Sequence, residues 1–217
     1  MKFISSCKLG FALLGLIGAL CSANVARATA YTVNLDTAAI AGNAAGPFYL
    51  DFQSIYGSGS AQVITLSNFL LTGGGFVNGT EFAIGAVAGD LASALVLSPD
   101  SSNFYNEFFQ QFEASVTHIR FDLDIVGGAS GATPTSFAVS LLDGTDLFAI
   151  PTTGFADTLV MFDIDGANTT FATASSTGAT AGATASVSVP DTSLTLLLLL
   201  GGLAAMGVMR RRHALAA

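Results

Sequence analysis

Oxygen-bearing side chains recur in the segment Asp163-Ile164-Asp165-Gly166-Ala167-Asn168. Carboxylate and amide oxygens at this spacing around a glycine turn suit a hard cation, so Asp163, Asp165 and Asn168 are candidate calcium ligands. The full calcium loop would carry a glutamate at the position that Ala174 occupies here. Asp-Gly is also a very common turn dipeptide, so an ordinary turn is the alternative. We therefore expect no cofactor, with calcium at this segment as a weak candidate.

His118 is the one histidine between residues 31 and 190, so a Ser-His-Asp triad in this part of the chain would need it. The alternation of the segment places His118 on the same strand face as Arg120 and Asp122, whereas the nearest serine, Ser115, falls on the opposite face. The chain also lacks a Gly-x-Ser-x-Gly nucleophile elbow. We expect no catalytic residue here and no enzyme activity, and we expect Arg120 to pair with a carboxylate such as Asp122. A hydrolase that uses two carboxylates is a more distant alternative, since no acidic pair stands out.

The charge of the chain excludes one class of partner. Between residues 31 and 190 there are fourteen acidic residues and one basic residue, which gives a net charge of about −13 with histidine neutral. Binding to nucleic-acid phosphates needs clustered lysine and arginine, so nucleic acid is not an expected partner. Both cysteines, Cys7 and Cys21, lie near the N-terminus, where a processed chain would lose them, so disulfides and cysteine-ligated metals are not expected.

The elements that must position these residues are predicted to be strands, because apolar and polar residues alternate with period two in six segments. Glycine- and aspartate-containing turns separate the segments, a pattern typical of a β-sandwich or jelly roll. The fold class is therefore expected to be all-β, with a single sandwich-like domain over residues 31–174. The positions expected to share a core face are Tyr31, Val33 and Leu35; Phe48, Leu50 and Phe52; Ile64, Leu66 and Leu70; Ile119, Phe121, Leu123 and Ile125; Phe137, Val139 and Leu141; and Val160, Phe162 and Ile164.

One segment departs from this alternation. Phe104, Phe108 and Phe112 are spaced by four, and a serine or aspartate precedes them, which predicts a short amphipathic helix that packs on the sandwich. An exposed aromatic stripe that binds sugar is the functional alternative. After the domain, residues 175–188 contain mostly Ala, Thr, Gly and Ser, and we expect them to form a flexible linker.

The first 30 residues are typical of a secretory signal peptide. Lys2 and Lys8 precede a short apolar run, and Ala28 and Ala30 supply the small residues that signal peptidase requires. We expect cleavage before Tyr31 and export of the rest of the chain.

The last 29 residues, 189–217, have three parts. Val189, Pro190 and Asp191 precede an apolar run of 16 residues, which is followed by Arg210, Arg211 and Arg212. As a helix of about 1.5 Å per residue, this run is marginally long enough to cross a bilayer. The arginines would then stay on the cytoplasmic side and the domain would lie outside. A plain tail anchor is the alternative to a processed signal.

This layout resembles the PEP-CTERM sorting signal of Gram-negative bacteria, which exosortases recognise. The family has Val-Pro-Glu-Pro before the helix, and the segment from Val189 to Thr192 is closer to a variant group that begins Val-Pro-Asp-Ser. Phe48–Gln53 and Thr65–Phe69 are also similar to one group of PEP-CTERM proteins. The resemblance implies export, transient retention in the inner membrane and cleavage near the motif, often alongside exopolysaccharide production.

Together these observations predict an exported surface or extracellular-matrix protein with a structural or adhesive role. Signal peptidase, exosortase and, transiently, the inner membrane are its expected partners, and extracellular polysaccharide is a further candidate partner. The alternative is a carbohydrate-binding module, with or without calcium.

Overall fold

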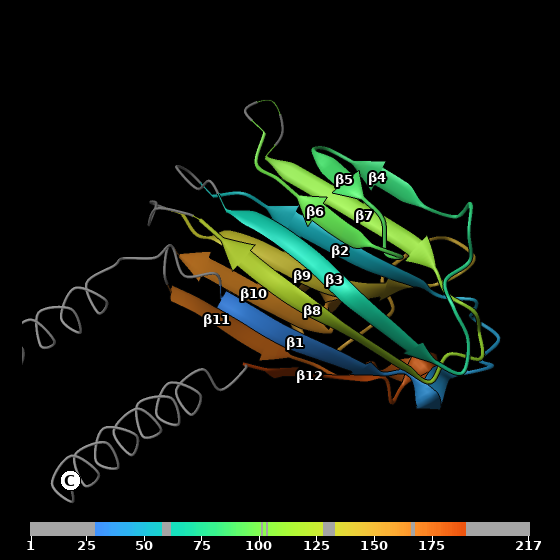
Figure 1. Cartoon of the computed structure of the whole chain (residues 1–217). Helices are drawn as coiled ribbons and strands as arrows, with labels where there is room; N and C mark the ends of the chain where they lie inside the picture. The colour runs from blue at the N-terminus through green and yellow to red at the C-terminus, as the bar shows by residue number, and fades with distance from the viewer. Residues whose placement is uncertain are drawn as a thin grey trace, which may run out of the picture.

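A computed structural model of the chain describes residues 29–57, 62–100, 102, 104–127, 133–165 and 168–189. Within these ranges the regular elements are β-strands and three short 3-10 turns, η1 (Ala38–Ile40), η2 (Phe155–Asp157) and η3 (Gly178–Thr180). The strands form two antiparallel sheets of six, which lie over one another as two layers (Figure 1). The prediction of an all-β domain is confirmed.

Sheet A has the strand order β12-β1-β8-β3-β6-β5. Its strands are β12 (Thr184–Ser188), β1 (Thr29–Asp36), β8 (His118–Val126), β3 (Val63–Thr72), β6 (Ala94–Leu97) and β5 (Val87–Gly89). Sheet B has the order β11-β10-β9-β2-β7-β4. Its strands are β11 (Asn168–Thr173), β10 (Val160–Asp165), β9 (Thr135–Leu142), β2 (Tyr49–Ile55), β7 (Tyr105–Gln111) and β4 (Phe82–Ile84).

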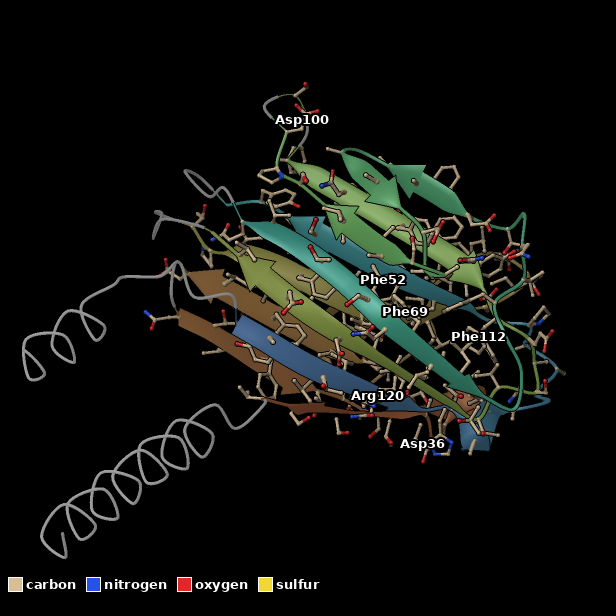
Figure 2. The ribbon with its side chains drawn as sticks, in the orientation of Figure 1. Asp36, Phe52, Phe69, Asp100, Phe112 and Arg120 are labelled. Carbon is tan, nitrogen blue, oxygen red and sulfur yellow. The ribbon has the colours of Figure 1, made fainter. Side chains whose placement is uncertain are left out.

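The core fills the space between the sheets with aromatic and branched side chains. Phe52 of sheet B meets Phe69 and Phe121 of sheet A at ring-centroid distances of 6.0 and 5.4 Å, and Figure 2 labels Phe52 and Phe69. Near the start of β1, the ring of Tyr31 lies 5.1 Å from that of Phe162 in β10. Offset and edge-on ring pairs of this kind add to the free energy of burial. Alternation in β1, β2, β8, β9 and β10 places the expected apolar residues in this core, as predicted.

Leu70 is an exception to the predicted core. Ile64 and Leu66 are buried, but Leu70 is 59% exposed. The register between β3 and β8 shifts between Ser67 and Leu70, and Asn68 has a φ of 55°. This bulge reverses the alternation, so that Phe69 turns toward the core in place of Leu70.

The predicted helix around Phe104–Phe112 is wrong, because this segment forms β7. A spacing of four is also a multiple of two, so Phe108 and Phe112 lie on one face of an extended chain as well as of a helix. The other inward positions of β7 hold Asn106 and Gln110, which are buried and hydrogen-bonded. These two polar residues interrupt the alternation of apolar and polar residues that would otherwise predict a strand.

The flexible linker expected at residues 175–188 is also wrong. Its last part forms β12, which pairs with β1 along five residues. Ala185 and Val187 pack against the core. Small polar residues satisfy one another here: the Ser176 amide donates to the Ala183 carbonyl at 2.8 Å, and the Ala183 amide donates to Ser176 Oγ at 2.8 Å. The folded domain therefore extends to Ser188, the residue before the expected sorting motif.

Candidate functional site

Two of the residues expected to direct processing, Ala30 and Val189, lie at one end of sheet A. Ala30 lies in β1 opposite Asp124, and Val189 directly follows β12 and is 56% exposed. Ala28, Pro190, Asp191 and the three arginines 210–212 lie outside the described residues. The apolar run 194–209 does as well, and among the residues the structure does describe no helix is long and apolar enough to cross a membrane.

The calcium candidates lie in a β-hairpin. Asp163 and Asp165 occupy alternate, exposed positions of β10, and Asp165 pairs with Asn168 across the hairpin. Asp163 accepts a hydrogen bond of 3.1 Å from Ser136 Oγ on the neighbouring strand. Within the described part of the chain, no three His, Cys, Asp or Glu side chains form a group that could hold a metal ion. The described residues on either side of this segment belong to two paired antiparallel strands.

Asp122 is the centre of a polar network on the outer face of sheet A. Its Oδ1 accepts a hydrogen bond of 2.8 Å from Thr32 Oγ1, and its Oδ2 accepts a hydrogen bond of 2.9 Å from Asn68 Nδ2. Arg120 Nη2 lies 3.9 Å from Asp122 Oδ1, which confirms the expected ion pair. Figure 2 labels Arg120 and Asp36 on this sheet. His118 Nε2 lies 3.7 Å from Asp36 Oδ1, and both side chains are more than half exposed.

Asp36, His118 and Arg120 line a shallow groove of about 470 Å³ that also includes Leu70 and Thr184. His118 Nδ1 lies 3.2 Å from Thr117 Oγ1. The ring of His118 therefore lies between Asp36 and Thr117 at the surface of sheet A. The arrangement stabilises a strand face and does not resemble a triad.

The outer face of sheet B holds a group of polar residues that the sequence did not single out, here called the acid–amide cluster: Asp51, Gln53 and Glu107. Gln53 Nε2 donates a hydrogen bond of 2.8 Å to Asp51 Oδ2 and one of 3.4 Å to Glu107 Oε1, so one amide joins two carboxyl groups. Strand register explains the grouping, because Gln53 of β2 lies directly opposite Glu107 of β7. The two acids are 56 residues apart in sequence, and only the pairing of β2 with β7 brings them together.

Asp51 is fully buried although it points away from the core of the sandwich. It lies between Phe109 of β7 and Ser140 of β9 in the strand register. Its Oδ1 has no hydrogen-bond partner. Burial, and to a smaller extent the charge of Glu107, raises the pKa of Asp51 to about 7, against the opposing hydrogen bond from Gln53. Burial and the same two carboxyl groups also raise the pKa of Tyr105.

Aromatic side chains stand beside this cluster and are here called the ring group: Tyr49, Phe82 and Phe109. Phe82 of the edge strand β4 stacks on Phe109 with a centroid distance of 5.0 Å and an interplanar angle of 23°. Tyr49 meets Phe109 edge-on at 5.7 Å. Phe82 is 48% exposed, and Ile84 on the same face is 41% exposed.

A groove of about 440 Å³ lies at the other side of sheet B. The exposed ring of Phe155 stands over it, and Met161, Asp163 and Thr170 line its floor. The outer face of sheet B therefore presents apolar rings at both sides with polar side chains between them.

The pair Asp51 and Glu107 does not meet the needs of acid–base catalysis. Carboxyl groups with pKa values pushed apart are a mark of hydrolases. A catalytic acid must nevertheless touch the substrate, and Asp51 has no exposed surface. Asp51 instead holds the amide of Gln53 in place through its Oδ2.

The chain matches no known protein-family model, no curated protein and no solved structure. Its function must therefore be argued from its own residues.

Proposed function

We propose that this chain is an exported bacterial protein that an exosortase processes, and that its jelly-roll-like β domain has a structural or adhesive role at the cell surface or in the extracellular matrix. The observation that carries the proposal is the C-terminal layout of Val189-Pro190-Asp191, an apolar run and three arginines. The signal-peptide pattern at the opposite end of the chain agrees with it. In this proposal the protein is a substrate of enzymes and is not one itself.

The order of these segments along the chain gives the proposed order of export, membrane retention and cleavage. Signal peptidase cleaves after Ala30, and the apolar run 194–209 holds the chain in the inner membrane with the arginines inside. Exosortase then cuts near Val189–Asp191. The domain is left outside, with a surface whose negative charge favours solubility and keeps copies apart.

The close approach of the two ends of the domain supports this order of events. Thr32 and Ser188 are paired in β1 and β12, so Ala30 and Val189, which adjoin the two proposed cleavage positions, lie at one end of sheet A. That end would face the membrane while both segments are attached. The opposite end and both outer faces would then be available to the matrix.

Variants of the motif test the proposal in a host that has the exosortase. Pro190→Ala and Asp191→Ala should leave the full chain in the membrane fraction, whereas the wild type should appear in the medium or at the surface. Thr192→Ala is the matched control, since the variant groups of the motif differ at this position. If all three variants are released like the wild type, exosortase processing at this motif is contradicted.

A second candidate function is carbohydrate binding. The observation that favours it is the ring group, because its member Phe82 is half exposed and stacks on Phe109 at the sheet face, and exposed apolar surface of this kind can mark a binding surface. A glycan array probed with and without calcium tests this function. Binding that requires calcium would support Asp163, Asp165 and Asn168 as calcium ligands.

A further inference from the structure

We propose that the outer face of sheet B binds a neutral polysaccharide, with Phe82 and its ring group as the apolar platform and with Gln53 and Glu107 as hydrogen-bond partners of sugar hydroxyls. The inference rests on the second candidate function and names its site and its ligand class.

The ring group is held in place before any ligand arrives. Phe82 stacks on Phe109, and Phe109 in turn is held edge-on by Tyr49. Three strands, β4, β7 and β2, each contribute one ring to this platform. A side chain fixed in this way loses little conformational entropy when a ligand covers it. The half-exposed ring of Phe82 can therefore bury the apolar face of a sugar at low cost.

Hydrogen-bonding groups lie next to the platform in the strand register. Ile84, Glu107 and Gln53 form one row across β4, β7 and β2, adjacent to the row of Phe82 and Phe109. An ionised carboxylate has about four acceptor sites, and Glu107 uses some of them for Gln53 and Tyr105. Glu107 and Gln53 are half-buried. Both are placed to accept hydrogen bonds from hydroxyl groups above the sheet.

Asp51 provides independent support for a binding role of this face. A buried oxygen without a partner costs roughly 1–3 kcal/mol, and such groups in native proteins call for an explanation. Asp51 Oδ1 is such an atom, while its Oδ2 holds the amide of Gln53. We assign Asp51 as a positioning residue, which fixes Gln53 and does not touch the ligand itself.

The charge of the face selects the ligand class. Arg120 is the one lysine or arginine among the described residues, and it lies on sheet A. The outer face of sheet B instead carries Glu107, Asp163 and Asp165. Polyanions such as uronate-rich or sulfated polysaccharides would be repelled. A neutral polymer offers hydroxyl donors without this repulsion.

The size of the face suits a chain and not a single sugar. Neighbouring strands are about 4.8 Å apart, so six strands span roughly 24 Å. The ring group lies at the β4 side of this face, and the groove under Phe155 lies toward the β11 side. An extended polymer can therefore contact both ends of the sheet.

Affinity electrophoresis of the full chain in mild detergent tests the inference. Gels would contain hydroxyethyl cellulose, dextran or glucomannan as neutral probes, and alginate as the anionic probe. We expect retardation by at least one neutral polymer and none by alginate. Retardation by alginate alone, or by none of the four polymers, would overturn the inference.

Variants then locate the site. Phe82→Ala and Glu107→Gln should each weaken binding of the retained polymer by about tenfold, because each removes one stacking or charged contact. Glu107→Gln keeps the shape of the side chain, which guards against a folding defect in Phe82→Ala. Phe104→Ala is the matched control, since Phe104 is 74% exposed and precedes β7 outside the ring group. Gln53→Ala should weaken binding while circular dichroism stays unchanged.

The two levels of the proposal fail in different ways. If the wild type binds a neutral polymer and Phe82→Ala and Glu107→Gln bind it equally well, the site is elsewhere and this inference is wrong, while carbohydrate binding as a function survives. If a broad glycan array shows no binding at all, the candidate function itself is wrong.

Discussion

Thr32 and Ser188 are register partners across the β1–β12 ladder. Tyr31, the expected first residue of the mature chain, lies in β1 next to Thr32, and Val189, the first residue of the expected sorting motif, directly follows β12. A cut at or after Val189 leaves the whole of β12 in place. A cut before Thr184 would remove an edge strand of sheet A.

The first prediction concerns the boundary of the domain. A chain that ends at Val189 should unfold at the same temperature as the full protein, whereas a chain that ends at Ala174 should lose on the order of 3 kcal/mol or more. The loss follows because β1 would lose its five-residue partner strand and the packing of Val187. Thermal unfolding followed by circular dichroism measures the difference. Equal melting temperatures for the two chains would contradict this boundary and support a flexible linker at residues 175–188.

The second prediction concerns Asp51 and pH. The pKa of Asp51 is about 7 in the folded protein and near its ordinary value of 3.8 in the unfolded chain. At a pH between these two pKa values, Asp51 is protonated in the folded state and ionised in the unfolded state. The free energy of unfolding should therefore fall as the pH rises from about 4 to about 7. The contribution is on the order of 4 kcal/mol.

Asp51→Asn should remove this dependence and raise stability at pH 8, as urea titrations at several pH values would reveal. Asp163→Asn is the control, because Asp163 is exposed. If Asp51→Asn leaves the stability at pH 8 unchanged, the carboxyl group is not buried in the charged form, and its account here is wrong.

The third prediction concerns Arg120. Its contact with Asp122 is 3.9 Å long and partly exposed, so the pair should contribute little. Its larger effect is the relief of repulsion among nearby acids, which salt screens. Arg120→Ala should lower the melting temperature by about 1–3 °C at low salt and by less at 0.5 M salt. Arg120→Lys, which keeps the charge, should unfold close to the wild type. An equal melting temperature for Arg120→Ala and wild type at low salt would contradict this role.

The fourth prediction concerns Tyr31. Its ring is 4% exposed and packs against Phe162, so the expected mature N-terminal residue belongs to the core. Tyr31→Ala should cost about 3–5 kcal/mol, as other large aromatic truncations do. Tyr31→Phe keeps the ring and should cost much less. Chemical denaturation measures both, and a cost below about 1 kcal/mol for Tyr31→Ala would show that the start of β1 is frayed.

The sequence was sufficient for the strands whose alternation is unbroken. In β8, Ile119 and Phe121 face the core and Arg120 faces solvent, as period two predicts. It was insufficient where polar residues occupy inward positions, as Asn106 does in β7, or where a bulge reverses the faces, as at Asn68 in β3. In both cases the deciding contacts come from other strands.

The residues of the proposed binding face could be predicted only in part. Asp51 stands at an outward position of its strand, as alternation requires, but its burial depends on neighbours from β7 and β9 that the local pattern does not reveal. The exposed aromatic stripe considered as the alternative to a helix includes Phe104, Phe108 and Phe112, but Phe108 and Phe112 are buried in the core. Phe109 of that segment points outward, but its partners Phe82 and Tyr49 come from distant parts of the chain.

The central claim is that the chain is exported and cut at both ends. Intact mass of the protein recovered from cells and medium, in hosts with and without the exosortase, tests it most directly. The account predicts a chain that begins at Tyr31, ends near Val189–Asp191 and appears only when the exosortase is present. A chain that keeps its C-terminus and stays in the membrane of both hosts would contradict the account and make the tail a simple anchor.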